Sequence, residues 1–161
     1  MVQYEWCKGA VPSSLKVKQV YGIAFDSNGM VLLRVDQGVY KLTGGKPEEA
    51  DVDYEATLKR EYLEELNVML ENIFYLGYLK VTEGDEVYAQ VRMLAKIKSI
   101  GKVRADTDSG KVYGRFMSKQ ENVKEYLKYP DIAGTELIED AIKMANEVYT
   151  FDMSRDAYFV E

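Results

Sequence analysis

The most regular alternation of hydrophobic and polar residues runs through residues 86–100 and predicts a β-strand. One face of this strand is apolar and carries Val87, Ala89, Val91, Met93, Ala95 and Ile97. The other face carries Tyr88, Gln90, Arg92, Lys96 and Lys98, interrupted by Leu94. We expect the apolar face to join the core. The polar face either meets solvent or lines a cleft, in which Arg92 is a candidate substrate-binding residue for a phosphate.

Further strands are predicted where β-branched and aromatic residues cluster between turn signals. The strongest of these signals is Asn28-Gly29, which favours the positive φ angles of a tight hairpin. In chain order the predicted strands are 15–25, 30–35, 39–42, 67–81, 86–100 and 115–118. Residues 101–114 are expected to form a loop.

Three segments predict helices. The first follows the acidic stretch 48–53, in which Asp51 or Asp53 can cap the helix N-terminus, and it ends near Val68. The second covers 121–129 and is stopped by a proline, and the third, amphipathic, covers 135–148 with Thr135 as N-cap. Residues 1–14 are interpreted as a lead-in segment whose aromatic side chains pack on the domain, and 149–161 as a tail that docks or extends a dimer interface.

The composition is that of one domain covering residues 1–161, long enough to form a core. The net charge of −6 argues against a general binder of nucleic acid or of anionic membranes. No apolar run reaches transmembrane length and no signal peptide is evident, so the expected location is cytoplasmic. The chain contains no histidine, which excludes histidine triads and histidine-ligated zinc. Any acid or base must then be Glu, Asp, Lys or Tyr.

The first predicted helix carries an unusual charge pattern. Its apolar stripe consists of Tyr54, Leu58, Tyr62 and Leu66. Glu61, Glu64 and Glu65 fall on one arc of the helix, which borders this stripe instead of lying opposite to it. Like charges at the edge of a buried face repel one another, so a positive group is expected among them.

Clusters of carboxylates suit hard divalent cations such as Mg²⁺ or Mn²⁺. Mg²⁺ commonly binds one or two carboxylates, water and a substrate phosphate, so this cluster indicates phosphate chemistry. The alternative is an ordinary charged surface helix, since Lys59 and Arg60 are interleaved with the glutamates.

The stretch from Gly44 to Val68, GGKPEEADVDYEATLKREYLEELNV, resembles the Nudix box, which covers about a sixth of the chain. In the Nudix family this box reads glycine, five residues, glutamate, seven residues, and then Arg-Glu-U-x-Glu-Glu-x-Gly-U, where U is a bulky aliphatic residue. The residues that match are Gly45, Arg60, Glu61, Glu64, Glu65 and Val68, with Tyr62 at the first U.

Three positions depart from the family pattern. Val52 stands where the family has the first glutamate, so that Asp51 or Asp53 would have to replace it. The loop after Gly45 is one residue longer. Asn67 replaces the closing glycine, and asparagine is the next best residue for a left-handed helix terminus.

The resemblance implies an α/β (α+β) fold, an α/β/α sandwich with a mixed, curved sheet between helices. It also implies a metal-dependent hydrolase that cleaves the diphosphate linkage of a small nucleoside diphosphate derivative, with Mg²⁺ as cofactor and Mn²⁺ as a substitute. The metal ligands would be Glu61, Glu64, Glu65 and the Gly45 carbonyl, and Glu61, Glu64 and Arg60 are the candidate catalytic residues.

The resemblance also implies roles for Arg60, within the helix, and for residues outside it. Arg60 would orient a glutamate through an ion pair. Gly44 would bring backbone close to the substrate, while Asp106 and Asp108 are candidates for the base or an extra ligand. No nucleic-acid or membrane partner is expected, and a homodimer is compatible with the family. Two alternatives remain open: a catalytically inactive nucleotide- or sugar-phosphate-binding module, and a chance match on a charged helix.

Overall fold

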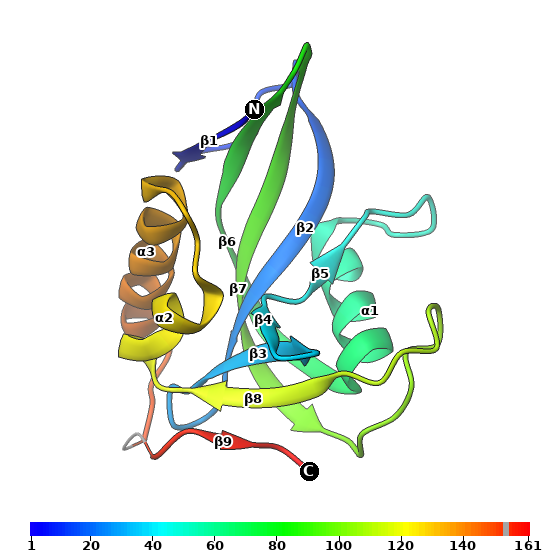
Figure 1. Ribbon diagram of the computed structural model, residues 1–161, viewed down its shortest axis with the longest axis vertical. Coiled ribbons are helices and arrows are strands. Elements are labelled where there is room, and N and C mark those ends of the chain that lie inside the picture. Colours follow the sequence, from blue (N-terminus) through cyan, green and yellow to red (C-terminus); the bar gives the residue numbers. More distant parts are fainter. Residues whose placement is uncertain (153–154) are drawn as a thin grey trace.

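The computed structural model describes residues 1–152 and 155–161, and a curved mixed sheet covered by helices on both faces forms its centre (Figure 1). The strands of the described part are β1 (Val2–Cys7), β2 (Lys16–Phe25), β3 (Val31–Asp36), β4 (Val39–Lys41), β5 (Gly44–Gly45), β6 (Val68–Glu83), β7 (Glu86–Ile100), β8 (Gly114–Ser118) and β9 (Tyr158–Phe159). The helices are α1 (Tyr54–Leu66), α2 (Val123–Leu127) and α3 (Ile132–Val148), with a 3₁₀ turn η1 (Gln120–Asn122) before α2.

The strand order is β1-β6-β7-β2-β3-β8-β9, with β4 beside β3 and β5 beside β2. Strands β2 and β7 are parallel, whereas the other pairings in the described part are antiparallel. The predicted mixed sheet between helices is therefore confirmed. None of the helices in the part of the chain that the structure describes has the length and apolar character needed to cross a bilayer.

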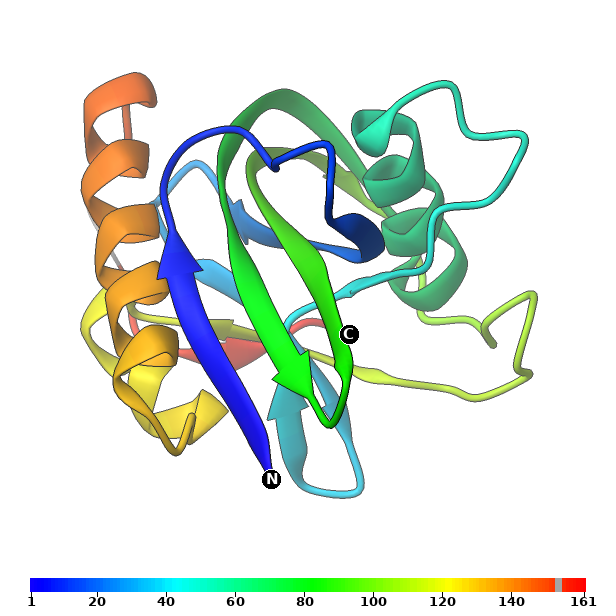
Figure 2. The same cartoon turned by 90° about the horizontal axis from the view of Figure 1, so that it is seen from above.

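Helix α1 and the pair α2–α3 cover opposite faces of the sheet, as the two perpendicular views show (Figures 1 and 2). Alternation along β2 explains this layering, because Val20 and Ala24 belong to the core under α1 and Phe25 to the core under α3. Gly22 lies directly beneath α1, where an added Cβ would come within 2.9 Å of both Leu58 and Tyr62. The small residues of β2 therefore let α1 pack closely on the sheet.

The ends of two helices differ from the predictions. Thr135 was expected to cap the last helix, but α3 begins at Ile132, and the carboxylate of Asp131 accepts from the Gly134 N–H at 3.3 Å. Aspartate is as good an N-cap as threonine and lies one residue before the observed helix, so the prediction of the start was wrong by three residues. Tyr54 is 38% exposed and does not join the buried stripe, because it is the first residue of α1.

Both terminal segments contain strands that the sequence patterns did not predict. Strand β1 in the lead-in segment pairs with β6, and Trp6 Nε1 donates a hydrogen bond to Asp140 of α3 at 2.8 Å. In the tail, β9 pairs with β8, while residues 153–154 lie outside the described residues. Strands of six and two residues give too short a pattern for periodicity to identify.

Asn67 closes α1 in the left-handed conformation, with φ 53° and ψ 47°. Its backbone N–H donates to the carbonyl of Leu63 at 3.1 Å, and its side-chain amide donates to the carbonyl of Lys102 at 3.0 Å. The prediction that asparagine serves here in place of glycine is confirmed.

We expect Asn67→Val to lower the free energy of unfolding by about 1–2 kcal/mol, because a β-branched residue is strained in the left-handed region. Asn67→Gly is the matched control: it loses the side-chain hydrogen bond but removes the strain, so its stability should stay close to that of the wild type. Urea denaturation measures both variants. Equal stabilities for the two variants would contradict the assignment of Asn67 as a strained cap.

Candidate active site

Helix α1 presents its glutamates along the edge that faces the glycine strand β5. Arg60 lies among them: its Nη1 is 3.0 Å from Glu61 Oε1 and 3.4 Å from Glu64 Oε2. These two contacts fix the rotamers of both carboxylates, because a guanidinium holds its donors in a rigid plane. The ion pairs expected between Arg60 and the glutamates are present, and the orienting role of Arg60 stays a prediction.

Asp51 anchors Arg60 from the loop before the helix. Its carboxylate accepts two hydrogen bonds, from Nε at 3.1 Å and from Nη2 at 2.9 Å, and the Lys46 carbonyl accepts a third from Nη2 at 3.1 Å. Val52 is 89% exposed and makes no comparable contact. Asp53 is the N-cap of α1 and accepts from the Ala56 N–H at 2.8 Å. The two aspartates thus divide the functions that the sequence left open: Asp51 holds the arginine and Asp53 caps the helix.

Glu65 is held by a second arginine that the sequence analysis missed. Arg34 Nη1 donates to Glu65 Oε1 at 3.0 Å, and the guanidinium lies 4.5 Å from the centre of the Tyr113 ring. The other oxygen of Glu65, Oε2, is buried and has no hydrogen-bond partner among the described residues. The one signal for Arg34 is a single cation inside the apolar strand sequence VLLRVD, and its partner could not be read without the fold.

The glycine pair brings backbone directly against these carboxylates. An added Cβ at Gly45 would lie 2.3 Å from Glu61 Oε1, and one at Gly44 would lie 2.1 Å from the carbonyl oxygen of Val20. Any side chain at either position would therefore displace Glu61 or separate β5 from β2. The two glycines are required by this close packing, and they place the Gly45 backbone beside the acidic group.

Burial dominates the electrostatics of the three glutamates. It raises the pKa of Glu61 to about 7 against the opposing effect of Arg60, and it also raises the pKa of Glu64 and Glu65, opposed by Arg60 and Arg34 respectively. The hydrogen bonds from Arg60 instead hold the pKa of Asp51 well below its usual range. The glutamates are thus a cluster whose negative charge is only partly compensated within the protein.

The loop 101–113 lies beside this cluster. Asp106 is only 7% exposed, and its carboxylate accepts from the Asp108 N–H at 2.8 Å. The charge of Asp106 contributes to the raised pKa of both Glu64 and Glu65, and that of Asp108 to the raised pKa of Glu64. The structure therefore brings both predicted aspartates near the glutamates, with Asp106 the more enclosed of the two.

The glutamates do not converge on a point by themselves. In residues 1–152 and 155–161, no three acidic or cysteine side chains are grouped closely enough to form a cation site. The ion pairs explain this spacing, because Arg60 draws Glu61 and Glu64 toward Asp51 while Arg34 draws Glu65 toward β3.

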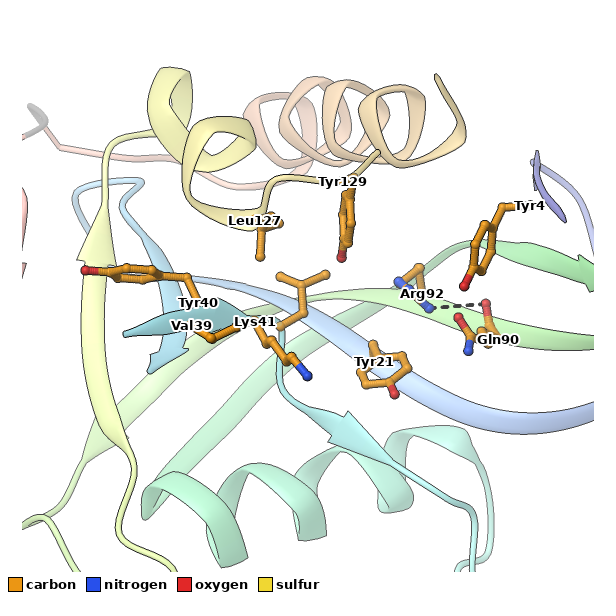
Figure 3. A pocket seen from close by; sticks show the side chains of 10 residues that line it. Tyr4, Tyr21, Val39, Tyr40, Lys41, Gln90, Arg92, Leu127 and Tyr129 are labelled. Atoms are coloured by element: carbon orange, nitrogen blue, oxygen red, sulfur yellow. Dashed lines mark hydrogen bonds between the residues drawn. The ribbon is translucent and has the colours of Figure 1, made fainter. Parts of the chain in front are cut away.

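A pocket of about 360 Å³ opens on the α2–α3 side of β2 and β7 (Figure 3). Tyr21 and Arg92 form part of its wall, and the guanidinium of Arg92 lies 4.6 Å from the centre of the Tyr21 ring. Burial raises the pKa of Tyr21, and the charges that act on it include those of Arg92, Arg34 and Glu65. The predicted substrate residue Arg92 therefore lines a cavity on the α2–α3 side of the sheet.

No family model matches the sequence, and no curated protein matches it significantly. Solved structures do match. A mutant of the pyrophosphohydrolase BsRppH from Bacillus subtilis has a TM-score of 0.69 at 23% identity, covering 91% of this chain and 92% of that one. The Nudix domain of NrtR from Shewanella oneidensis, in complex with ADP-ribose, gives 0.59 at 20% identity, covering 81% and 89%.

A third match is the MutT protein from Bacillus halodurans, with a TM-score of 0.54 at 24% identity, covering 75% of this chain and 78% of that one. The three matches share the arrangement of sheet and helices described above and extend over most of both chains. They show that this chain has the Nudix fold, which confirms the fold expected from the box.

The raised pKa of Glu61 predicts a pH-dependent stability. A carboxyl group with a higher pKa in the folded chain binds its proton more tightly there, so its stabilising contribution is complete below its ordinary pKa of 4.5 and is lost as pH rises through about 7. We expect the thermal midpoint in EDTA to fall between about pH 5 and pH 8, and to fall less in Glu61→Gln. Identical pH profiles for the two proteins would show that Glu61 is not desolvated as described.

Proposed function

We propose that this protein is a metal-dependent hydrolase that cleaves the diphosphate linkage of a nucleoside diphosphate derivative. One observation carries the proposal: three glutamates at the buried margin of α1 are oriented by two separate arginines and face a glycine strand, at the position of the box in a Nudix fold. A charged surface helix needs none of these contacts. The named neighbours support the proposal, since one is a pyrophosphohydrolase and another is a domain solved with ADP-ribose.

The residues present fit a divalent cation of the Mg²⁺ or Mn²⁺ class. The donors are all oxygen, as these cations prefer, and Glu65 Oε2 is a buried acceptor that has no partner within the described part of the chain. Glu61, Glu64, Glu65 and the Gly45 carbonyl would hold the ion. When bound, it would neutralise phosphate charge and lower the pKa of a water molecule.

The protein's own groups supply orientation and proton transfer. Arg60 and Arg34 hold the carboxylates in place before substrate arrives, so that little reorganisation is needed during the reaction. Glu61 and the enclosed Asp106 are the two candidate general bases. Burial raises the pKa of Glu61 to about 7, and a base is most effective when its pKa lies near the working pH. A substrate-binding role for Arg92 and the backbone approach at Gly44 remain part of the same proposal.

A second function is favoured by a specific observation. Each glutamate is paired with an arginine and no three carboxylates of the described residues converge, as expected of a fold that binds a nucleotide or sugar phosphate without cleaving it. Val52, which is exposed and stands in place of the family glutamate, also favours a binding module that does not cleave its ligand. Both the hydrolase and the binding module would bind a nucleotide derivative, but only the hydrolase would cleave it. A cytoplasmic location and a homodimer remain predictions.

The proposal predicts that Glu64→Gln lowers kcat at least roughly 100-fold. Loss of a direct metal ligand should lower activity at least as much as loss of a residue that only hydrogen-bonds to a ligand. The Glu64 side chain is partly exposed, and within the described residues its ion pair is with Arg60, so the thermal midpoint should change little. Glu55→Gln is the matched control on the same helix, because Glu55 is partly exposed and its ion pair, in the part of the chain that the structure describes, is with Lys59. Unchanged turnover in Glu64→Gln would overturn the metal-site assignment.

A further inference from the structure

Arg92 is a buried cation that the protein leaves without a counter-charge. The residue is 4% exposed, and no carboxylate of the described residues lies within ion-pair distance of it. Its one hydrogen bond is a long contact of 3.5 Å from Nη1 to the Gln90 carbonyl, and its Nε has no partner. Burying such a group is costly unless acceptors are supplied, so we expect a ligand to supply them.

The surroundings of Arg92 restrict what that ligand can be. The 360 Å³ pocket continues into a second cavity of about 170 Å³, and Tyr4, Gln90, Arg92 and Tyr129 line both. Figure 3 shows the Tyr129 and Tyr4 side chains on either side of Arg92, reaching over the strand from α2–α3 and from β1. Neither ring stacks on another aromatic ring in the described part of the chain. A cavity lined by two tyrosine side chains beside a buried guanidinium suits a flat heterocycle better than a phosphate.

Gln90 adds a second polar group to the pocket, and this one can accept a hydrogen bond where Arg92 can only donate. It lies two residues before Arg92 on β7, so both side chains are on the same face of the strand. Its side-chain Nε2 donates to Gln19 Oε1 at 3.1 Å, and its side-chain Oε1 accepts no hydrogen bond from the described residues. The floor of the pocket therefore offers donors from Arg92 beside an acceptor from Gln90.

We propose that this pocket binds a 6-oxopurine base, guanine or hypoxanthine, with Arg92 donating to O6 and N7 and Gln90 accepting from N1–H. This inference rests on the proposed function, since it names the base of the nucleotide that the site would cleave. A 6-oxopurine presents an acceptor beside a donor, which matches the Arg92–Gln90 pair. Adenine presents an amino group where O6 would be and would set donor against donor.

The test is calorimetric binding of mononucleotides to the full chain in EDTA, where hydrolysis plays no part. We expect GMP and IMP to bind with similar affinity and roughly ten- to hundredfold more tightly than AMP and CMP. On the wild-type protein, 7-deaza-GMP, which lacks the N7 acceptor, should bind about tenfold more weakly than GMP.

Arg92→Gln should remove the preference for GMP over AMP, and its thermal midpoint shows whether the variant is folded. Lys98→Ala is the matched control, since it removes an exposed cation from the same strand and should keep the preference. Equal affinity for all four mononucleotides, no binding of any of them, or full affinity for 7-deaza-GMP would overturn the inference. A base preference in EDTA without turnover in Mg²⁺ would instead overturn the proposed hydrolysis and leave the base assignment standing.

Discussion

The structure depends on how three carboxylates are accommodated along the edge of a buried face. Burial and mutual repulsion both oppose their ionisation, as the raised pKa values of Glu61, Glu64 and Glu65 show. Two arginines offset part of that cost, and each acts from a different element: Arg60 from α1 itself and Arg34 from β3. The remaining negative charge makes the cluster a candidate cation site.

The fold supplies the geometry that this arrangement needs. Gly22 lets α1 lie against β2, and the Gly44–Gly45 strand brings a backbone carbonyl beside Glu61. Because β2 and β7 are neighbours, the same strands carry Tyr21 and Arg92 into the adjoining pocket. The acidic helix and the pocket therefore lie on opposite faces of this pair of strands.

The sequence predicted the features that depend on local pattern. The spacing of Arg60, Glu61, Glu64 and Glu65 located the acidic helix, and the left-handed preference of asparagine explained Asn67. Features that depend on long-range packing were missed. Arg34 meets Glu65 across 31 positions, and β1 is recognisable only when β6 lies beside it. Arg115, placed by the sequence next to an aromatic residue, is buried and donates to the carbonyls of Leu66 and Gly101, a role that no local pattern reveals.

The most direct test of the account is hydrolysis of a substrate panel with Mg²⁺ and with EDTA, followed by phosphorus NMR of the products. The panel contains nucleoside triphosphates, ADP-ribose, other nucleotide sugars and dinucleoside polyphosphates. We predict turnover of at least one member by cleavage between two phosphates, and loss of that turnover in EDTA. Turnover that persists in EDTA, or no turnover alongside nucleotide binding, would contradict a metal-dependent hydrolase. The latter result would identify the protein as a binding module.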